Sequence, residues 1–337
     1  MTTTGDTEGE PGRDTVSVVI PAFNESGAIS DLSLEVIRVL EDIDAEPEIV
    51  VVDDGSTDDT SGVVMALRST DPRVHLVRLS RNFGHQAALA AGLRQATGDA
   101  VVSMDGDGQH PPATVATMVQ AWRAGSEVVN TRRIDSDDAG FLKRRSARIF
   151  YRLFRWLSGL QLEDGMADFR LMSRPALEAA LASMRTRPFI RGVAVWIGFE
   201  QSVVSYRAQD RRSGASSFSP RAMFALARDG IVGFSARPLW IISTLGFAAS
   251  MVAFAIASYA IIVGLVSDQA VPGWASTVGF ISILQGLGFI LLGVIGVYLG
   301  AIFSEVLDRP TYIVSTVDGD DPVDRPGARP SRLGSDP

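Results

Sequence analysis

Short apolar runs alternate with amphipathic or alanine-rich stretches over the first third of the chain. The runs are rich in the β-branched residues that are typical of buried strands. They cover residues 16–20, 48–52, 74–79 and 99–104. Asn24 or Ser26 could cap a helix after the first run, and Ser56 or Thr57 a helix after the second. Strands that alternate with helices predict an α/β domain with a mainly parallel sheet.

Polar residues follow each of these four runs at the point where the strand should end. They are Asn24 and Glu25, Asp53 and Asp54, the segment 81–85, and Asp105 and Asp107. Because the carboxyl ends of parallel strands meet at one edge of a sheet, we expect a ligand site there. Asp and Asn also make turns and cap helices, so any one of these loops alone would indicate no site.

The fourth loop reads Asp105-Gly106-Asp107-Gly108. Two carboxylates one residue apart can bind a hard cation, Mg²⁺ or Mn²⁺, that also holds the phosphates of a ligand. The two glycines let the backbone approach a ligand closely. The alternative is an Asp/Gly turn with no ion. The chain has no cysteine, which excludes disulfides and thiolate metal sites.

Two long runs near the C-terminus, residues 238–267 and 269–304, contain no Asp, Glu, Lys, Arg or His. They predict two transmembrane helices, at 238–267 and 277–304, because a core helix of a soluble protein is rarely uncharged on every face. The loop between them lacks Lys and Arg, whereas arginines flank the pair. The positive-inside rule then places the N-terminal domain and both termini in the cytoplasm. Glycines of the second run could pack against the first run or another subunit.

The remaining segments complete the predicted organisation. Residues 1–14 form a disordered polar tail, 15–220 the α/β domain, 221–237 a juxtamembrane amphipathic segment and 305–337 a cytoplasmic segment with a disordered end. Residues 140–160 predict a basic amphipathic helix, which suits either an anionic membrane surface or a solvated face of the domain. The net charge of −8 argues against a nucleic-acid partner.

Four motifs, in this order and spacing, carry a resemblance: SVVIPAFNE, VVDDGSTDDT, LSRNFGHQAAL and MDGDGQHPP. They resemble the inverting family-2 glycosyltransferases with a GT-A fold, a Rossmann-like α/β domain. Within that family the chain is similar to the polyisoprenyl-phosphate glycosyltransferases, the dolichol-phosphate-mannose-synthase-like group and its bacterial GtrB-type members. The resemblance covers about residues 16–314. No GxGxxG follows the first strand, so a dinucleotide site lacks its signature.

The resemblance implies a role for residues at each loop. Asp105 and Asp107 would hold the metal and the donor diphosphate. The family more often reads DADLQ where this chain reads DGDGQ, so we expect a looser loop. The nucleotide-sugar site would comprise Pro21, Ala22, Asn24, Glu25, Asp53, Asp54, Arg81, Asp105, Gly106, Asp107 and Gln109.

An acceptor site is implied further along the chain. Asp168, in ADFRL, resembles the catalytic carboxylate of the GDFRL signature, although Glu163 and Asp164 are competing carboxylates. Arg191, in FIRG, occupies the place of an arginine that faces phosphate. The segment RRSGASSF lacks the usual lysine of a flexible loop, so Arg211 or Arg212 would supply the cation. The implied acceptor residues are Arg132, Arg170, Arg191, Arg211 and Arg212.

The predicted activity is the inverting transfer of a hexose from a nucleotide sugar to a polyisoprenyl phosphate at the cytoplasmic face of the cell (inner) membrane. UDP-glucose is the usual donor in the GtrB-type group; GDP-mannose, galactose and N-acetylhexosamine donors share the motifs. The second pKa of a phosphate monoester is about 6, so the acceptor is mostly a dianion at neutral pH. We therefore expect Asp168 to orient Arg191 or the sugar rather than act as a base.

Three other functions are alternatives to this activity. A processive polysaccharide synthase would carry QxxRW after the catalytic Asp, whereas the nearest match here, RLFRW at 152–156, lies before Asp168. A nucleotidyltransferase would need a glycine-rich first loop with a basic residue. A non-enzymatic membrane scaffold would be expected to have lost Asp105 or Asp107, and both are present.

Overall fold

The computed structural model describes residues 13–134, 156–158, 166–184, 190–209, 231–232, 235–266, 273–307 and 309–320. It divides into two compact units. The sheet unit comprises Met1–Tyr151, Gln161–Ser219 and Pro310–Pro337, and the helical unit comprises Arg152–Leu160 and Pro220–Arg309. Several predicted features lie outside the described residues: Glu163, Asp164, Arg211, Arg212, most of the basic segment 140–160 and most of 221–237.

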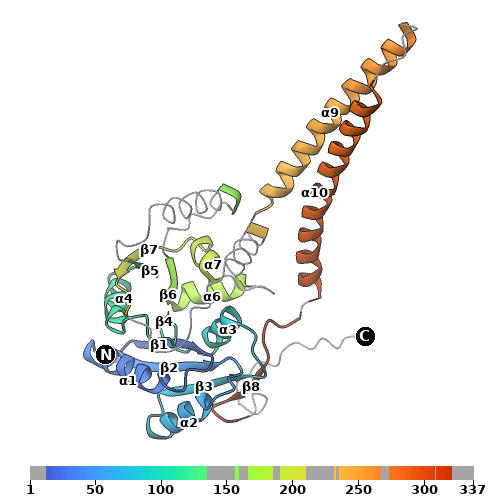
Figure 1. The fold of residues 1–337 in the computed structure, drawn as a ribbon. Helices are drawn as coiled ribbons and strands as arrows, with labels where there is room; N and C mark the ends of the chain where they lie inside the picture. Colours follow the sequence, from blue (N-terminus) through green and yellow to red (C-terminus); the bar gives the residue numbers. More distant parts are fainter. Residues whose placement is uncertain are drawn as a thin grey trace, which may run out of the picture. The chain divides into compact units, whose positions relative to one another are not determined.

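The sheet unit is built on one eight-stranded sheet in the order β7-β5-β6-β4-β1-β2-β3-β8 (Figure 1). The four central strands β4, β1, β2 and β3 are parallel, while β6 runs antiparallel to β4 and β5, and β8 antiparallel to β3. The strands are β1 (Thr15–Ala22), β2 (Glu46–Asp53), β3 (Val74–Leu79), β4 (Ala100–Ser103), β5 (Val128–Arg133), β6 (Met166–Ser173), β7 (Gln201–Tyr206) and β8 (Val314–Val317). This confirms the predicted α/β class and its mainly parallel central sheet.

Helices cover both faces of this sheet because the strand residues are apolar on both sides. Val18 and Ile20 pack in one core with α1, α2 and α4, while Val19 faces α3 on the other side. A Cβ on Gly92 of α3 would lie 2.3 Å from Val19 Cγ1, so only glycine allows this close approach. The helices are α1 (Ile29–Asp42), α2 (Thr60–Thr70), α3 (His85–Gln95), α4 (Ala113–Arg123), α6 (Arg174–Ser183) and α7 (Ile190–Trp196).

The predicted helix caps are wrong. The helix α1 begins at Ile29 after Ala28, and α2 at Thr60 after Asp59, and neither Ala28 nor Asp59 makes a side-chain cap hydrogen bond. The polar side chains at 24 and 56 instead join the loops that follow β1 and β2. Polar residues can bond to a neighbouring loop as well as to a helix end, and the sequence does not distinguish the two.

The helical unit contains two long helices, α9 (Arg237–Val266) and α10 (Trp274–Val306) (Figure 1). They pack where Gly246 faces Leu291. Within the described residues, one stretch, Ile283–Val306, is long and apolar enough to cross a membrane. Five glycines of α10 have no atom within 4 Å of the place where a Cβ would lie, so among the described residues they do not pack against α9. They are Gly286, Gly288, Gly293, Gly296 and Gly300.

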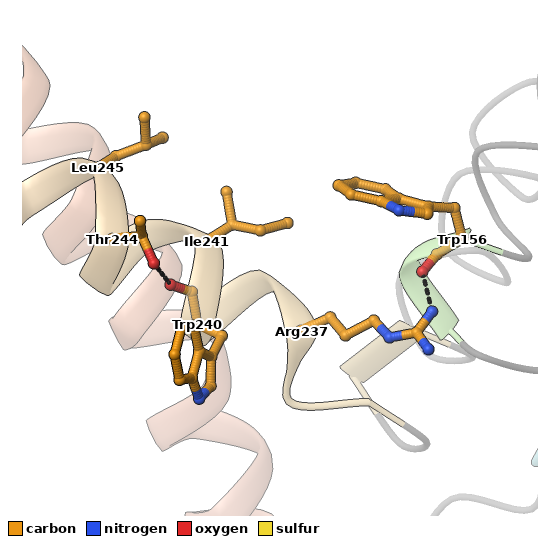
Figure 2. A pocket seen from close by; sticks show the side chains of 6 residues that line it. All are labelled: Trp156, Arg237, Trp240, Ile241, Thr244 and Leu245. Carbon is orange, nitrogen blue, oxygen red and sulfur yellow. Dashed lines mark hydrogen bonds between the residues drawn. The ribbon is translucent and has the colours of Figure 1, made fainter.

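An apolar pocket of about 430 Å³ lies at the start of α9, within the helical unit (Figure 2). Arg237 donates a hydrogen bond to the carbonyl oxygen of Trp156, and Thr244 Oγ1 donates to the carbonyl oxygen of Trp240 at 2.9 Å. Both tryptophan side chains are exposed. The pocket is lined by Trp156, Arg237, Trp240, Ile241, Thr244 and Leu245.

The sequence analysis named the four runs that form β1 to β4, so β5 to β8 are additional strands, and β8 is the one that comes from the far end of the chain. The strand β8 comes from the segment 305–337, after α10, and pairs with the edge of β3. Asp318, directly after β8, is buried, with 3% of its side chain exposed. Part of the predicted C-terminal tail is therefore an ordered component of the sheet unit.

Candidate active site

The loops after β1 and β2 are joined by hydrogen bonds at the carboxyl edge of the sheet. Asn24 Oδ1 accepts from the backbone N–H of Thr57 at 2.9 Å, and the N–H of Asn24 donates to Ser56 Oγ at 3.0 Å. The N–H of Glu25 donates to Thr60 Oγ1 at 3.0 Å. Asn24 has φ +59°, a left-handed conformation that Asn adopts more readily than most residues. These contacts make the two loops one surface.

Asp53 and Asp54 are buried at the end of β2 and serve neighbouring loops. Asp54 accepts from the N–H groups of Phe83 and Gly84, at 2.7 and 2.9 Å. Burial raises the pKa of the Asp54 carboxyl, and these two bonds oppose the rise. Asp53 Oδ1 accepts from the N–H of Ser56 at 2.8 Å. Both carboxylates thus hold loops in place, and their contact with a nucleotide stays a prediction.

The loop after β4 carries the two candidate metal ligands. The side chain of Asp105 is 37% exposed, and its backbone N–H donates to His110 Nδ1 at 3.1 Å. Asp107 Oδ1 accepts from the N–H of Gln109 at 3.1 Å. A Cβ on Gly106 would lie 3.2 Å from the carbonyl oxygen of Pro21, so this loop lies close against the end of β1.

His110 supports this loop through its hydrogen bond with the backbone of Asp105. It stacks on Phe169 with ring centroids 4.5 Å apart, and burial lowers its pKa. A neutral ring with Nδ1 as acceptor carries its proton on Nε2, which lies 3.7 Å from Asp105 Oδ2. The imidazole therefore orients the first carboxylate of the pair.

Asp105 and Asp107 fit a cation that takes some of its ligands from a substrate. Within the described residues, no group of three or more His, Asp or Glu side chains could hold a metal ion by itself. Mg²⁺ in particular is usually bound through one or two carboxylates together with substrate phosphates and water. The donor set at this loop suits such an ion.

Asp168, on β6, is held from two directions. Arg191 Nε lies 2.7 Å from Asp168 Oδ1 and Arg191 Nη2 lies 2.8 Å from Oδ2, which is the planar fork geometry of a strong ion pair. Gln86 Nε2 donates to Asp168 Oδ2 at 2.9 Å. Burial alone would raise the pKa of Asp168, but Arg191 and His85 lower it well below its usual value. An ionised carboxylate with both oxygens engaged is a poor proton acceptor.

His85 connects the two carboxylate sites. Its Nε2 lies 3.5 Å from Asp105 Oδ1 and 3.7 Å from Asp168 Oδ2. Burial lowers the pKa of His85, and the interactions with Asp168 and Asp105 outweigh that effect and raise it. The sequence analysis placed His85 in the third loop without a role and did not single out Gln86. Their signal was only their position at the end of a loop with other polar residues.

The predicted acceptor arginines separate into three environments. Arg191 faces Asp168, while Arg170 is 1% exposed and donates to the carbonyl oxygen of Ile190 at 3.3 Å. Burial lowers the pKa of Arg170 to about 10. Arg132 is exposed, and Arg211 and Arg212 lie outside the described residues. Arg81, predicted for the nucleotide-sugar site, is also exposed and stacks over Phe83 at 4.0 Å. Arg170 is thus placed beneath the site, where direct contact with an acceptor would require it to move.

Comparison with known proteins agrees with this geometry. Residues 17–181 match the family described as Glycosyl transferase family 2. A prophage bactoprenol glucosyl transferase homolog from Escherichia coli is 36% identical over 303 residues, covering 90% of this chain and 99% of that protein. An SfII prophage-derived bactoprenol glucosyl transferase from Shigella flexneri is 36% identical over 300 residues, covering 89% and 97%.

Among solved structures, glucosyl-3-phosphoglycerate synthase from Mycobacterium tuberculosis, in complex with Mn²⁺, UDP and glucosyl-3-phosphoglycerate, is 24% identical with a TM-score of 0.45. It covers 65% of this chain and 78% of that one, a likeness too low to support any statement about the site. The full-length sequence relatives carry the assignment. The chain is a glycosyltransferase and belongs to glycosyl transferase family 2, as its motifs indicated.

Proposed function

We propose that the enzyme transfers a hexose from a nucleoside-diphosphate sugar to the phosphate of a polyprenyl lipid, with inversion at the anomeric carbon. The observation that carries the proposal is the arrangement around His85, which places Asp105 of the candidate metal loop beside the Asp168–Arg191 ion pair. One side of the site suits a diphosphate and the other an anionic acceptor. The relatives named bactoprenol glucosyl transferase support this pairing of substrates.

A divalent cation on Asp105 and Asp107, Mg²⁺ or Mn²⁺, would supply a Lewis acid that neutralises the departing diphosphate. The protein residues do the rest. The acceptor phosphate is mostly a dianion at neutral pH and needs no base to attack. Asp168 fixes the plane of the Arg191 guanidinium, and that cation holds the incoming phosphate beside a buried carboxylate that would otherwise repel it. Asp168 is therefore a positioning residue in this proposal.

Both α9 and α10 cross the membrane in this proposal, with the sheet unit on the cytoplasmic side. The support is the absence of charged residues over both runs and the arginines that flank them. Trp156, Trp240 and Arg237 at the start of α9 combine exposed aromatic rings with a cation, as residues at a membrane interface do (Figure 2). The protein is then a multi-pass enzyme of the cell (inner) membrane.

We further propose glucose as the sugar and UDP-glucose as the donor. The support is the names of the relatives, since no described side chain distinguishes one sugar hydroxyl configuration from another. GDP-mannose, galactose and N-acetylhexosamine donors are the alternatives.

The test is lipid labelling. Membranes that contain the enzyme are incubated with polyprenyl phosphate, Mg²⁺ or Mn²⁺ and each of a panel of radiolabelled sugar nucleotides, and the lipid fraction is extracted. We expect label in the lipid fraction with UDP-glucose, none after chelation, and about 10³-fold slower labelling in the Asp105→Asn variant. Asp31→Asn, an exposed change on α1, is the matched control. Label in a polymer would indicate a processive synthase, and no label with any donor would overturn the proposal.

Thermal unfolding separates an enzyme from a scaffold and tests the nucleotide. A ligand at about 100 times its Kd adds about 2.7 kcal/mol to the free energy of unfolding. We expect UDP with Mn²⁺ to raise the melting temperature, and GDP or either nucleotide without metal to raise it less. An equal, zero response to all of them would favour a scaffold.

A further inference from the structure

The segment 313–320, which we call the clasp, pairs with the edge of β3 although it follows α10, the last helix among the described residues. Val314 pairs with Leu79 and Val317 with Val77, in antiparallel register. The N–H of Ser80 donates to the carbonyl oxygen of Ile313 at 2.9 Å, and the N–H of Asp318 donates to the carbonyl oxygen of Leu76 at 2.7 Å. The clasp therefore pairs with β3 from Leu76 to its carboxyl end at Ser80.

Asp318 anchors the clasp through a buried carboxylate whose side-chain partners are partly exposed. Its Oδ1 accepts from the N–H of Leu76 at 2.8 Å, and its Oδ2 lies 3.1 Å from His75 Nδ1 and 3.2 Å from Arg68 Nη2. Its backbone lies in the left-handed region, with φ +55°, which few residues other than glycine, Asn and Asp adopt. Such a carboxylate is expensive to bury unless its partners are held in place, so the contact is a built feature rather than a chance encounter.

The end of β3 that the clasp holds leads directly into the active site. Residues 81–84 follow Ser80, and their N–H groups at Phe83 and Gly84 donate to Asp54. The next two residues, His85 and Gln86, reach Asp105 and Asp168. A Cβ on Gly55 would lie 2.5 Å from the carbonyl carbon of Arg81, so this loop has no room to shift toward β2. At one end the loop continues from β3, whose edge the clasp covers, and at the other it leads into α3, which packs on the sheet.

We propose that the clasp positions the active site, and that Asp318 is a positioning residue for the transfer reaction. By fixing β3 up to Ser80 it fixes one end of the loop 80–84, which leads into the first turn of α3, where His85 and Gln86 meet the two carboxylates. The inference rests on the proposed function for its activity readout. It assigns a catalytic purpose to a segment that lies beyond the matched family region of residues 17–181.

A simpler role must be distinguished from this one. An uncovered β3 would be an exposed edge strand, and edge strands promote aggregation, so the clasp could serve only to cover it. A covering role predicts lower stability throughout the sheet unit with an unchanged rate per folded molecule. A positioning role predicts a local change at residues 80–86 and a slower reaction in protein that is still folded.

The experiment compares Asp318→Ala and Asp318→Asn with Asp320→Asn in the full-length protein in membranes or detergent. Asp320 belongs to the same segment, and its change removes the same charge from an exposed side chain. Hydrogen exchange is followed in peptides that cover residues 80–86 and, as a reference, β1 and β4. The rate of sugar transfer at saturating donor and the affinity for the nucleotide are measured on the same samples.

For Asp318→Ala we expect faster exchange at residues 80–86, unchanged exchange in β1 and β4, and a kcat lower by about tenfold or more with nucleotide affinity retained. Asp318→Asn keeps an oxygen for the Leu76 N–H and should recover part of the rate; it also decides the question if the alanine variant does not fold. Asp320→Asn should match the wild type. Uniformly faster exchange, or local loosening with an unchanged kcat, would overturn the proposal. A wild-type protein that transfers no sugar would instead contradict the proposed function, and the exchange pattern would still test the support of the loop.

Discussion

The two carboxylate sites of this enzyme differ in how much of their electrostatic environment the protein supplies. Asp168 has 8% of its side chain exposed and is paired with Arg191 in a fork, with Gln86 and His85 beside it. Asp105 is 37% exposed, and the nearest basic group among the described residues is the His85 imidazole, at 3.5 Å. A carboxylate that is already neutralised serves to position other groups. One that is half-open and weakly compensated suits a cation that arrives with the substrate.

The largest expected effect comes from Asp105, the more exposed of the two carboxylates. Asp105→Asn removes a hard ligand that only a cation would require, and we expect transfer to fall by about 10³-fold, as loss of Lewis-acid stabilisation costs several kcal/mol. Initial rates with and without a chelator measure it: the chelator should abolish the wild-type rate and change the variant little. A variant with a wild-type rate and a wild-type response to chelation would show that this loop holds no ion.

A smaller loss of activity is expected at Asp168, and the pH dependence of that loss identifies the role of this carboxylate. The pKa of Asp168 in the folded protein lies below its value in the unfolded chain, near 3.9. The contribution of the ionised carboxylate to folding stability is therefore complete above about pH 3.9, and it is lost only as the pH falls through the folded pKa. We therefore expect Asp168→Asn and Asp168→Ala to lower kcat by about 10²-fold at every pH from about 6 to about 9.

Melting curves recorded with these variants are the control for folding, because removing one partner of a buried ion pair costs about 3–5 kcal/mol. A rate loss confined to low pH, with full activity above neutrality, would contradict the orienting role. That pattern would indicate that Asp168 acts as a base that deprotonates the acceptor phosphate at low pH, a step that the fully ionised phosphate does not require.

A change at Gln86 tests how much of the positioning of Asp168 depends on its hydrogen bond with this side chain. Gln86→Met keeps the length of the side chain and removes the donor to Asp168 Oδ2, so Asp168 and Arg191 lose one constraint while the ion pair remains. We expect kcat to fall by about tenfold. Gln95→Met, at the exposed end of the same helix, is the matched control. Equal rates for the two variants would show that Arg191 alone holds Asp168.

The smallest effect should follow from Gly106→Ala in the metal loop. The added Cβ would lie 3.2 Å from the carbonyl oxygen of Pro21, a contact that a shift of a few tenths of an ångström relieves, and Gly106 does not have a positive φ. We expect a change in kcat of less than about threefold, or about 0.6 kcal/mol. A loss as large as that of Asp105→Asn would mean that the backbone here must approach the ligand more closely than a Cβ allows.

Much of the fold could be predicted because it depends on local patterns. All four apolar runs form strands, and the run at 74–79 has the predicted bounds. The convergence of polar loops also follows from chain order, since parallel strands deliver their carboxyl ends to one edge. The described polar residues do lie together at this edge, and their binding of substrates stays a prediction. Whether both apolar runs cross a membrane, and whether Arg211 or Arg212 binds phosphate, remain predictions.

The sequence alone determined the family, the α/β class with a mainly parallel central sheet and the residue types in the loops, because these depend on short motifs and on hydrophobic patterning. Only the tertiary structure showed that Gln86 meets Asp168, that Arg170 lies beneath the site, and that Asp318 holds β3. The physical reason is that each of these contacts joins residues far apart along the chain. Their distance and burial depend on how the strands and helices pack, which no local pattern encodes.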